Sequence, residues 1–176
     1  MKMTTTYEHP FETVQRLNNI AGNQSDQGWD AAEAQMKIID LEYKELQEGI
    51  ASRDIEQVRD GIADVMVTVL GLAHRTGIDA AADFKVVTDA LMSRFDLSKA
   101  NQQLTKEKYA GMGVDTVCRE VNYEGTTYYV TISSVNQTSK PINGSKEEFF
   151  PAGKWLKSVK TQQPVFDSLP PWNNLL

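Results

Sequence analysis

The sequence predicts a mainly α protein, an antiparallel helical bundle followed by a small C-terminal extension that contains a β-hairpin. Apolar residues recur at three- and four-residue spacing up to about residue 111, as in amphipathic helices. From Val114 onward the pattern changes to short β-branched and aromatic runs separated by turn residues. We therefore expect a helical domain over residues 1–112 and an extension over residues 113–176 that packs on the same domain.

Two helices are expected in the first third of the chain. A short one runs from Pro10, a favourable entry residue, to Ile20 before Ala21-Gly22. A polar loop separates it from a long helix that starts at Trp29 and ends near Ser52. One apolar stripe of the long helix comprises Met36, Ile39, Tyr43, Leu46 and Ile50.

A third helix begins after Asp54, which can cap it, and ends at Gly77. Because only a few residues join it to the long helix, the two should be antiparallel neighbours. A fourth helix is expected from about Asp79 to Phe95, and a fifth, more polar one over Lys99–Gly111.

A β-hairpin is expected in the extension. Residues 117–121 and 128–133 alternate or run in β-branched and aromatic types, with turn-forming Asn122 and Glu124-Gly125 between them. Proline and glycine recur along the last forty residues, which we therefore expect to be rich in turns.

Charge and cysteine content limit the partners. Residues 1–97 carry 17 acidic against 9 basic side chains, and residues 98–176 carry 7 against 9. The acidic part suits cations and disfavours a nucleic-acid partner. Cys118 is the sole cysteine, so no intrachain disulfide can form.

The N-terminus has no apolar signal region, and the run Ile62 to Ala73 is interrupted by Asp64. We therefore expect a cytoplasmic protein without a membrane partner.

Four carboxylates on the second and third helices form the candidate site: Glu42, Glu45, Asp60 and Asp64. Residues three or four apart share a helix face, so each pair points one way. Antiparallel packing would bring the pairs face to face beside the apolar seam. Carboxylates there are costly to bury without a cation between them, and oxygen ligands suit Mg²⁺ or Mn²⁺.

The same residues allow other interpretations. Glu42 and Glu45 can be solvated helix-face acids without function, whereas Asp64 within an apolar stretch is harder to explain in that way. A di-iron bundle needs Glu-x-x-His pairs, and neither His9 nor His74 follows a glutamate at that spacing. No P-loop and no Gly-x-Ser-x-Gly motif occurs.

Several segments resemble the all-α NTP pyrophosphohydrolase superfamily, the group of MazG, dimeric dUTPase and phosphoribosyl-ATP pyrophosphohydrolase. The resemblance lies in LEYKEL (Leu41 to Leu46) and DGIADVMVTVLGLAHRTGID (Asp60 to Asp79). LMSRF, TKEKYAGMGV and PAGKWLKS, which begin at residues 91, 105 and 151, extend it over nearly the whole chain. The similarity is greatest to small MazG-like proteins of phages and bacteria, and it implies a MazG-like bundle.

The resemblance also implies site residues. Glu42, Glu45 and Asp64 match acids that bind Mg²⁺ in the family, and Asp60 matches a phage-type subset. Two departures are Leu41 and Gly61, which stand where the family often has acids. Glu42 or Glu45 would orient or deprotonate the attacking water. Substrate-binding candidates are Arg94, Lys154 and Lys157 for phosphate, and Trp29 and Asn18 for the base.

The implied activity is metal-dependent hydrolysis of a nucleoside triphosphate, a purine dNTP such as dGTP being one candidate, to the monophosphate and pyrophosphate. The resemblance further implies a homodimer or homotetramer in the cytoplasm, the host cytoplasm for a phage-encoded chain. Two alternatives remain open: a phosphoribosyl-ATP pyrophosphohydrolase, and a non-enzymatic helical oligomeric adaptor.

Overall fold

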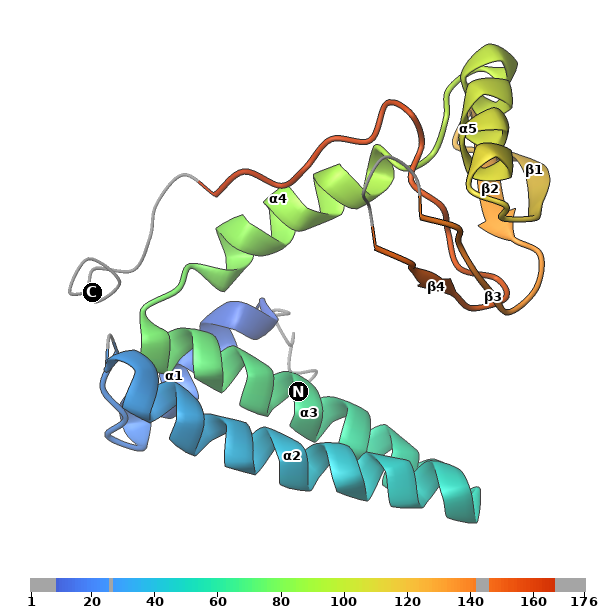
Figure 1. Cartoon of the computed structure of the whole chain (residues 1–176). Helices are drawn as coiled ribbons and strands as arrows, with labels where there is room; N and C mark the ends of the chain where they lie inside the picture. Colours follow the sequence, from blue (N-terminus) through green and yellow to red (C-terminus); the bar gives the residue numbers. More distant parts are fainter. Residues whose placement is uncertain (1–8, 26, 142–145, 167–176) are drawn as a thin grey trace, which may run out of the picture. The chain divides into compact units, whose positions relative to one another are not determined.

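The computed structural model describes residues 9–25, 27–141 and 146–166, which include five helices followed by short antiparallel strand pairs (Figure 1). The parts of the expected extension at 142–145 and 167–176 lie outside the described residues. Contacts divide the chain into two compact units. Unit 1 is Met1–Phe84 with Phe166–Leu176, and unit 2 is Lys85–Val165. The division falls within α4 (Ala80–Met92).

Unit 1 is built on α1 (Pro10–Ile20), α2 (Gly28–Ser52) and α3 (Ile55–Thr76). The expected antiparallel pairing of α2 and α3 is confirmed: they lie side by side (Figure 1), and Gly49 near the end of α2 approaches Gln57 near the start of α3. The helix α1 packs on α3.

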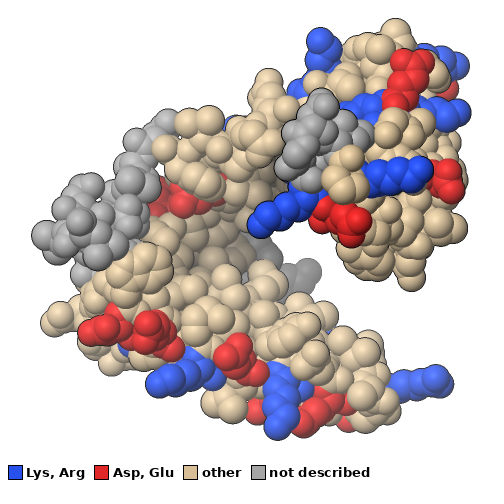
Figure 2. Space-filling view, viewed as in Figure 1, with Lys and Arg blue, Asp and Glu red and all other residues tan. Residues whose placement is uncertain are grey.

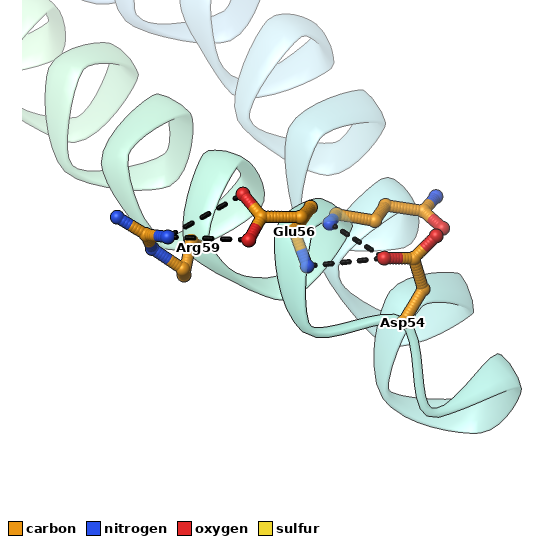
Figure 3. Close-up of polar contacts among 4 residues, drawn as sticks. Asp54, Glu56 and Arg59 are labelled. Atoms are coloured by element: carbon orange, nitrogen blue, oxygen red, sulfur yellow. Dashed lines mark hydrogen bonds and ion pairs between the residues drawn. The ribbon is translucent and has the colours of Figure 1, made fainter.

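Local signals set the ends of α3. The Asp54 carboxylate accepts hydrogen bonds from the backbone N–H groups of Glu56 (3.0 Å) and Gln57 (3.2 Å), as expected of an N-cap (Figure 3). Arg59 then pairs with Glu56 at 3.2 Å on the first turn. Gly77 ends the helix with φ 67°, a left-handed conformation in which glycine has no steric penalty.

Unit 2 combines α5 (Lys99–Gly111) with a hairpin of β1 (Thr116–Tyr123) and β2 (Thr126–Ser133). The strands pair antiparallel from Thr116 opposite Ser133 to Tyr123 opposite Thr126. Glu124 (φ 47°) and Gly125 (φ 80°) make the expected two-residue turn. A second short pair joins β3 (Gln137–Thr138) to β4 (Phe149–Phe150).

The apolar core of unit 2 lies between α5 and the chain that follows the hairpin. Its buried members are Tyr109, Val114, Phe150 and Leu156. The rings of Tyr109 and Phe150 meet edge to face at 5.8 Å, and the Tyr109 hydroxyl accepts a hydrogen bond from the Lys157 backbone N–H at 2.9 Å. Tyr109 therefore packs the segment after the hairpin against α5.

Asp96 is the most deeply buried acid of unit 2, with an exposed fraction of 2%. Its carboxylate accepts hydrogen bonds from the hydroxyls of Ser158 (2.5 Å) and Thr105 (3.0 Å). Its backbone also bridges to Tyr129 of β2. These bonds tie the C-terminal segment to α5 and to the hairpin.

Unit 1 has fewer buried apolar residues than unit 2. Val14 and Ala31 are the buried hydrophobic residues that the described part of this unit contains. Three residues of the apolar stripe on α2 are exposed, Met36, Tyr43 and Ile50, at 43%, 52% and 60%. No helix within the described ranges combines the length and the apolar character needed to cross a membrane.

Candidate metal centre

Close packing of α2 against α3 creates the seam that holds the candidate acids. A Cβ on Gly61 of α3 would lie only 3.0 Å from the Cα and Cβ atoms of Leu46 on α2. Further along the seam, the buried side chain of Gln35 donates a hydrogen bond from Nε2 to the Thr68 carbonyl oxygen at 3.0 Å. These two contacts therefore fix which faces of α2 and α3 meet.

Two glycine contacts define the register of this antiparallel pair. A Cβ on Gly49 of α2 would lie 3.1 Å from the Gln57 side chain of α3. A Cβ on Gly71 of α3 would lie 3.2 Å from Nε2 of Gln35 on α2. Each helix therefore presents two contact residues that lie fourteen positions apart in the sequence.

Glu42 and Asp64 lie midway between these contacts. Glu42 is seven residues from each contact on α2, and Asp64 is seven residues from each contact on α3. Seven residues return an α-helix to nearly the same face, so both acids belong to the faces that meet in the seam. The register therefore sets Glu42 opposite Asp64, and both residues are partly buried.

The electrostatics of Glu42 agree with this register. Burial raises the pKa of Glu42 above its ordinary value, and the negative charges of Glu45, Asp64 and Asp60 raise it further. Glu45 and Asp60 are exposed at the edges of the seam. Among the described residues, none of the four acids forms an ion pair with Lys or Arg. Their mutual repulsion is therefore not neutralised by the surrounding side chains.

The chemistry of these donors suits a hard divalent cation, because all four supply carboxylate oxygens. Over the described ranges, however, no three His, Cys, Asp or Glu side chains are already placed to hold a metal ion. Binding of a cation would require these carboxylates to rotate, or acids from a second copy of the chain to join them.

The two residues expected to contact a base differ in their surroundings. Asn18 is held in local hydrogen bonds, since Nδ2 donates to the Val14 carbonyl at 3.0 Å and Oδ1 accepts from Asn23 at 2.9 Å. Its amide therefore orders the end of α1. Trp29 stands on the first turn of α2 and is 56% exposed.

The three cations expected to contact phosphate separate into two places in unit 2. Arg94 and Lys157 line one small cavity. Lys154 pairs with Glu148 at 2.9 Å and lies 4.7 Å from the centre of the Phe150 ring. Lys154 is therefore engaged in the extension, whereas Arg94 and Lys157 come together.

Sequence reasoning missed Gln35, which links the two helices beside the acids. A signal was present, because Gln35, Glu42 and Gly49 follow one another at seven-residue spacing on the face of α2 that meets α3. The matching series on α3 is Gln57, Asp64 and Gly71. Two parallel series of this kind indicate a close helix pair with an acid at the centre of each helix.

The fold and this seam define a mainly α protein that carries a carboxylate cluster on a tightly packed helix pair. No protein-family model, curated protein or solved structure matches the chain.

Proposed function

We propose that this protein hydrolyses a nucleoside triphosphate to the monophosphate and pyrophosphate, with a divalent cation held by Glu42, Glu45, Asp60 and Asp64. Water would attack the α-phosphorus, and the bond from that phosphorus to the bridging oxygen would break. The substrate expected from the sequence resemblance is a (d)NTP, such as the purine nucleotide dGTP.

The observation that carries the proposal is the pairing of Glu42 with Asp64 across the α2–α3 seam. Repulsion from the other three acids raises the pKa of Glu42 after the larger effect of burial, and no described cation pairs with the cluster. Close like charges at a helix interface oppose folding unless a cation compensates them. A Mg²⁺ or Mn²⁺ ion would supply that compensation, activate water and neutralise phosphate oxygens.

The four acids would then have different roles in binding the cation and orienting water. Asp64 and Asp60 lie one turn apart on α3 and would hold the cation from that side. Glu42 and Glu45 would hold it from α2, and one of them would orient the attacking water.

We further infer that the chain assembles with copies of itself through the apolar faces of α2 and α3. Trp29, Met36, Tyr43 and Ile50 follow one another at seven-residue spacing and are all exposed. Ile55, Ile62, Met66 and Val69 form a corresponding exposed stripe on α3.

Such stripes are larger than the scattered apolar residues of a typical monomer surface. Charged side chains in Figure 2 gather over the lower edge of α2, and the surface above them is largely uncharged. A second α2–α3 pair would bury these stripes and give unit 1 the core that its single copy lacks. We therefore propose a homodimer or homotetramer, which the sequence resemblance also implies.

The activity is tested by measuring pyrophosphate release from a panel of ribo- and deoxyribonucleoside triphosphates with Mg²⁺ or Mn²⁺. The panel includes phosphoribosyl-ATP, which identifies the rival pyrophosphohydrolase. We expect at least one substrate to give equal amounts of monophosphate and pyrophosphate. Asp64→Asn should lower the rate by at least about tenfold, which corresponds to ~1.4 kcal/mol in the barrier.

Asp40→Asn is the matched control, because Asp40 is exposed on the same helix as Glu42. It should keep the wild-type rate. Absence of pyrophosphate from every nucleotide, with helical content intact, would reject the hydrolase and leave the oligomeric adaptor.

A further inference from the structure

A small cavity in unit 2 lies between the end of α4 and the C-terminal segment. Its volume is about 90 Å³, enough for several water molecules or one tetrahedral oxyanion. One wall is apolar and comes from α4. Its lining includes Leu91, Arg94, Lys157, Thr161 and Gln162.

Two hydrogen bonds hold the walls of this cavity together. The Ser93 hydroxyl accepts from the Gln162 backbone N–H at 2.8 Å. The Asp96 carboxylate accepts from the Ser158 hydroxyl at 2.5 Å. Arg94 lies between Ser93 and Asp96 in the sequence. The facing segments are therefore fixed on both sides of the Arg94 side chain, which favours a preformed site.

The cavity is electropositive. Arg94 and Lys157 line it, and no carboxylate of the described chain does. Neither cation forms an ion pair with a described residue. Burial lowers the pKa of nearby Lys108, and the positive charge of Lys157 lowers it further. An anion would relieve this repulsion.

Thr161 adds a polar group that lacks a partner. Its hydroxyl oxygen is buried and has no hydrogen-bond partner among the described residues. Buried hydroxyls are normally paired, so an unpaired one at the wall of a cavity points to an occupant. Gln162 also lines the cavity, and amide groups are common in oxyanion sites.

We propose that the cavity between Arg94 and Lys157 binds a phosphate group, either as free orthophosphate or as a phosphate of a nucleotide. Two cations with several N–H donors suit a tetrahedral oxyanion, and the arginine fork can bind two of its oxygens. The site lies in unit 2 and needs no divalent cation, so it stands whether or not the α2–α3 seam hydrolyses nucleotides.

The test is titration calorimetry of the full chain with orthophosphate, pyrophosphate and ATP in buffer that contains EDTA. The cavity variants are Arg94→Gln and Lys157→Gln. Arg119→Gln is the control, because Arg119 is exposed on β1 in the same unit. Lys157 is exposed, so its substitution keeps the test valid if Arg94→Gln disturbs folding.

We expect each cavity variant to weaken anion binding at least about fivefold, and Arg119→Gln to change it less than about twofold. Similar affinities for the three anions would identify free phosphate as the ligand. Tighter binding of ATP with the same dependence on the cavity cations would identify a nucleotide phosphate. Equal binding in all three variants, or no binding of any anion to the wild type, would overturn the proposal.

Discussion

Gly61 on α3 lies against Leu46 on α2 so closely that a Cβ at position 61 would be 3.0 Å from the Leu46 Cα and Cβ atoms. A carboxylate at this position would force the helices apart. The cluster therefore depends on Asp60 and Asp64 alone on α3.

Gly61→Ala should destabilise the protein. The added methyl group overpacks the seam, which destabilises the folded state by about 1–3 kcal/mol. Alanine has a higher helix propensity than glycine, but this stabilises the helix by at most about 1 kcal/mol. The control is Gly111→Ala, because a Cβ at Gly111 has no neighbour within 4 Å. Urea unfolding measures both variants. A Gly61→Ala protein as stable as the Gly111→Ala protein would contradict the close packing.

Glu42→Gln should stabilise the metal-free protein at neutral pH. Burial and three nearby acids raise the folded-state pKa of Glu42, so the folded state binds its proton more tightly than the unfolded state does. The stability contributed by protonated Glu42 is present below its unfolded pKa and is lost as the pH rises through the folded pKa.

Unfolding in EDTA at several pH values measures this effect. The advantage of Glu42→Gln should disappear at roughly pH 4 and below, where the wild-type carboxyl is protonated in both states. Asp40→Asn, on the same helix, should change stability at pH 7 by less than about 0.5 kcal/mol. Equal stability of Glu42→Gln and the wild type at pH 7 would mean that the acids do not repel one another.

The helices of unit 1 could be predicted from the sequence because their ends carry local signals. Asp54 caps α3 with two hydrogen bonds, and Gly77 ends it with a positive φ. The Glu124-Gly125 turn determines the hairpin in the same way. These features depend on neighbours in the sequence, so no knowledge of packing is needed to find them.

Long-range packing was harder to predict. The sequence shows that Tyr43 and Ile50 belong to an apolar stripe, yet both side chains are exposed. Hydrophobic periodicity shows which face of a helix is apolar. It does not show whether that face is buried against another part of the same chain or against a second molecule. Likewise, the hydrogen bond between Asp96 and Ser158 joins residues 62 positions apart, and no local sequence pattern predicts it.

Ser158→Ala should destabilise unit 2. The substitution leaves the buried Asp96 carboxylate without one of its two hydroxyl donors, at a cost of about 1–3 kcal/mol. Ser134→Ala is the control, since Ser134 lies at a more exposed hydrogen bond to Asp115 and should cost less than about 1 kcal/mol. Chemical denaturation compares them, and equal losses would argue against a structural role for the buried network.

Ile62→Lys should weaken self-association. Ile62 is 49% exposed within the apolar stripe of α3, and a lysine there would place a charge in the proposed interface. Ile20→Lys is the control, because Ile20 is 77% exposed at the end of α1. Sedimentation velocity should show a dimer or tetramer for the wild type and the control. A wild-type monomer at all accessible concentrations would rule out this interface.

Mg²⁺ titration of thermal unfolding at fixed protein concentration tests whether the seam acids hold a divalent cation. A ligand at about 100 times its Kd stabilises by ~2.7 kcal/mol, which raises the midpoint by roughly 5–10 °C for a protein of this size. Metal binding by the seam acids predicts this rise for the wild type and for Asp40→Asn, and its loss in Glu42→Gln and Asp64→Asn. An unchanged midpoint in the wild type, or the same rise in all four proteins, would contradict it.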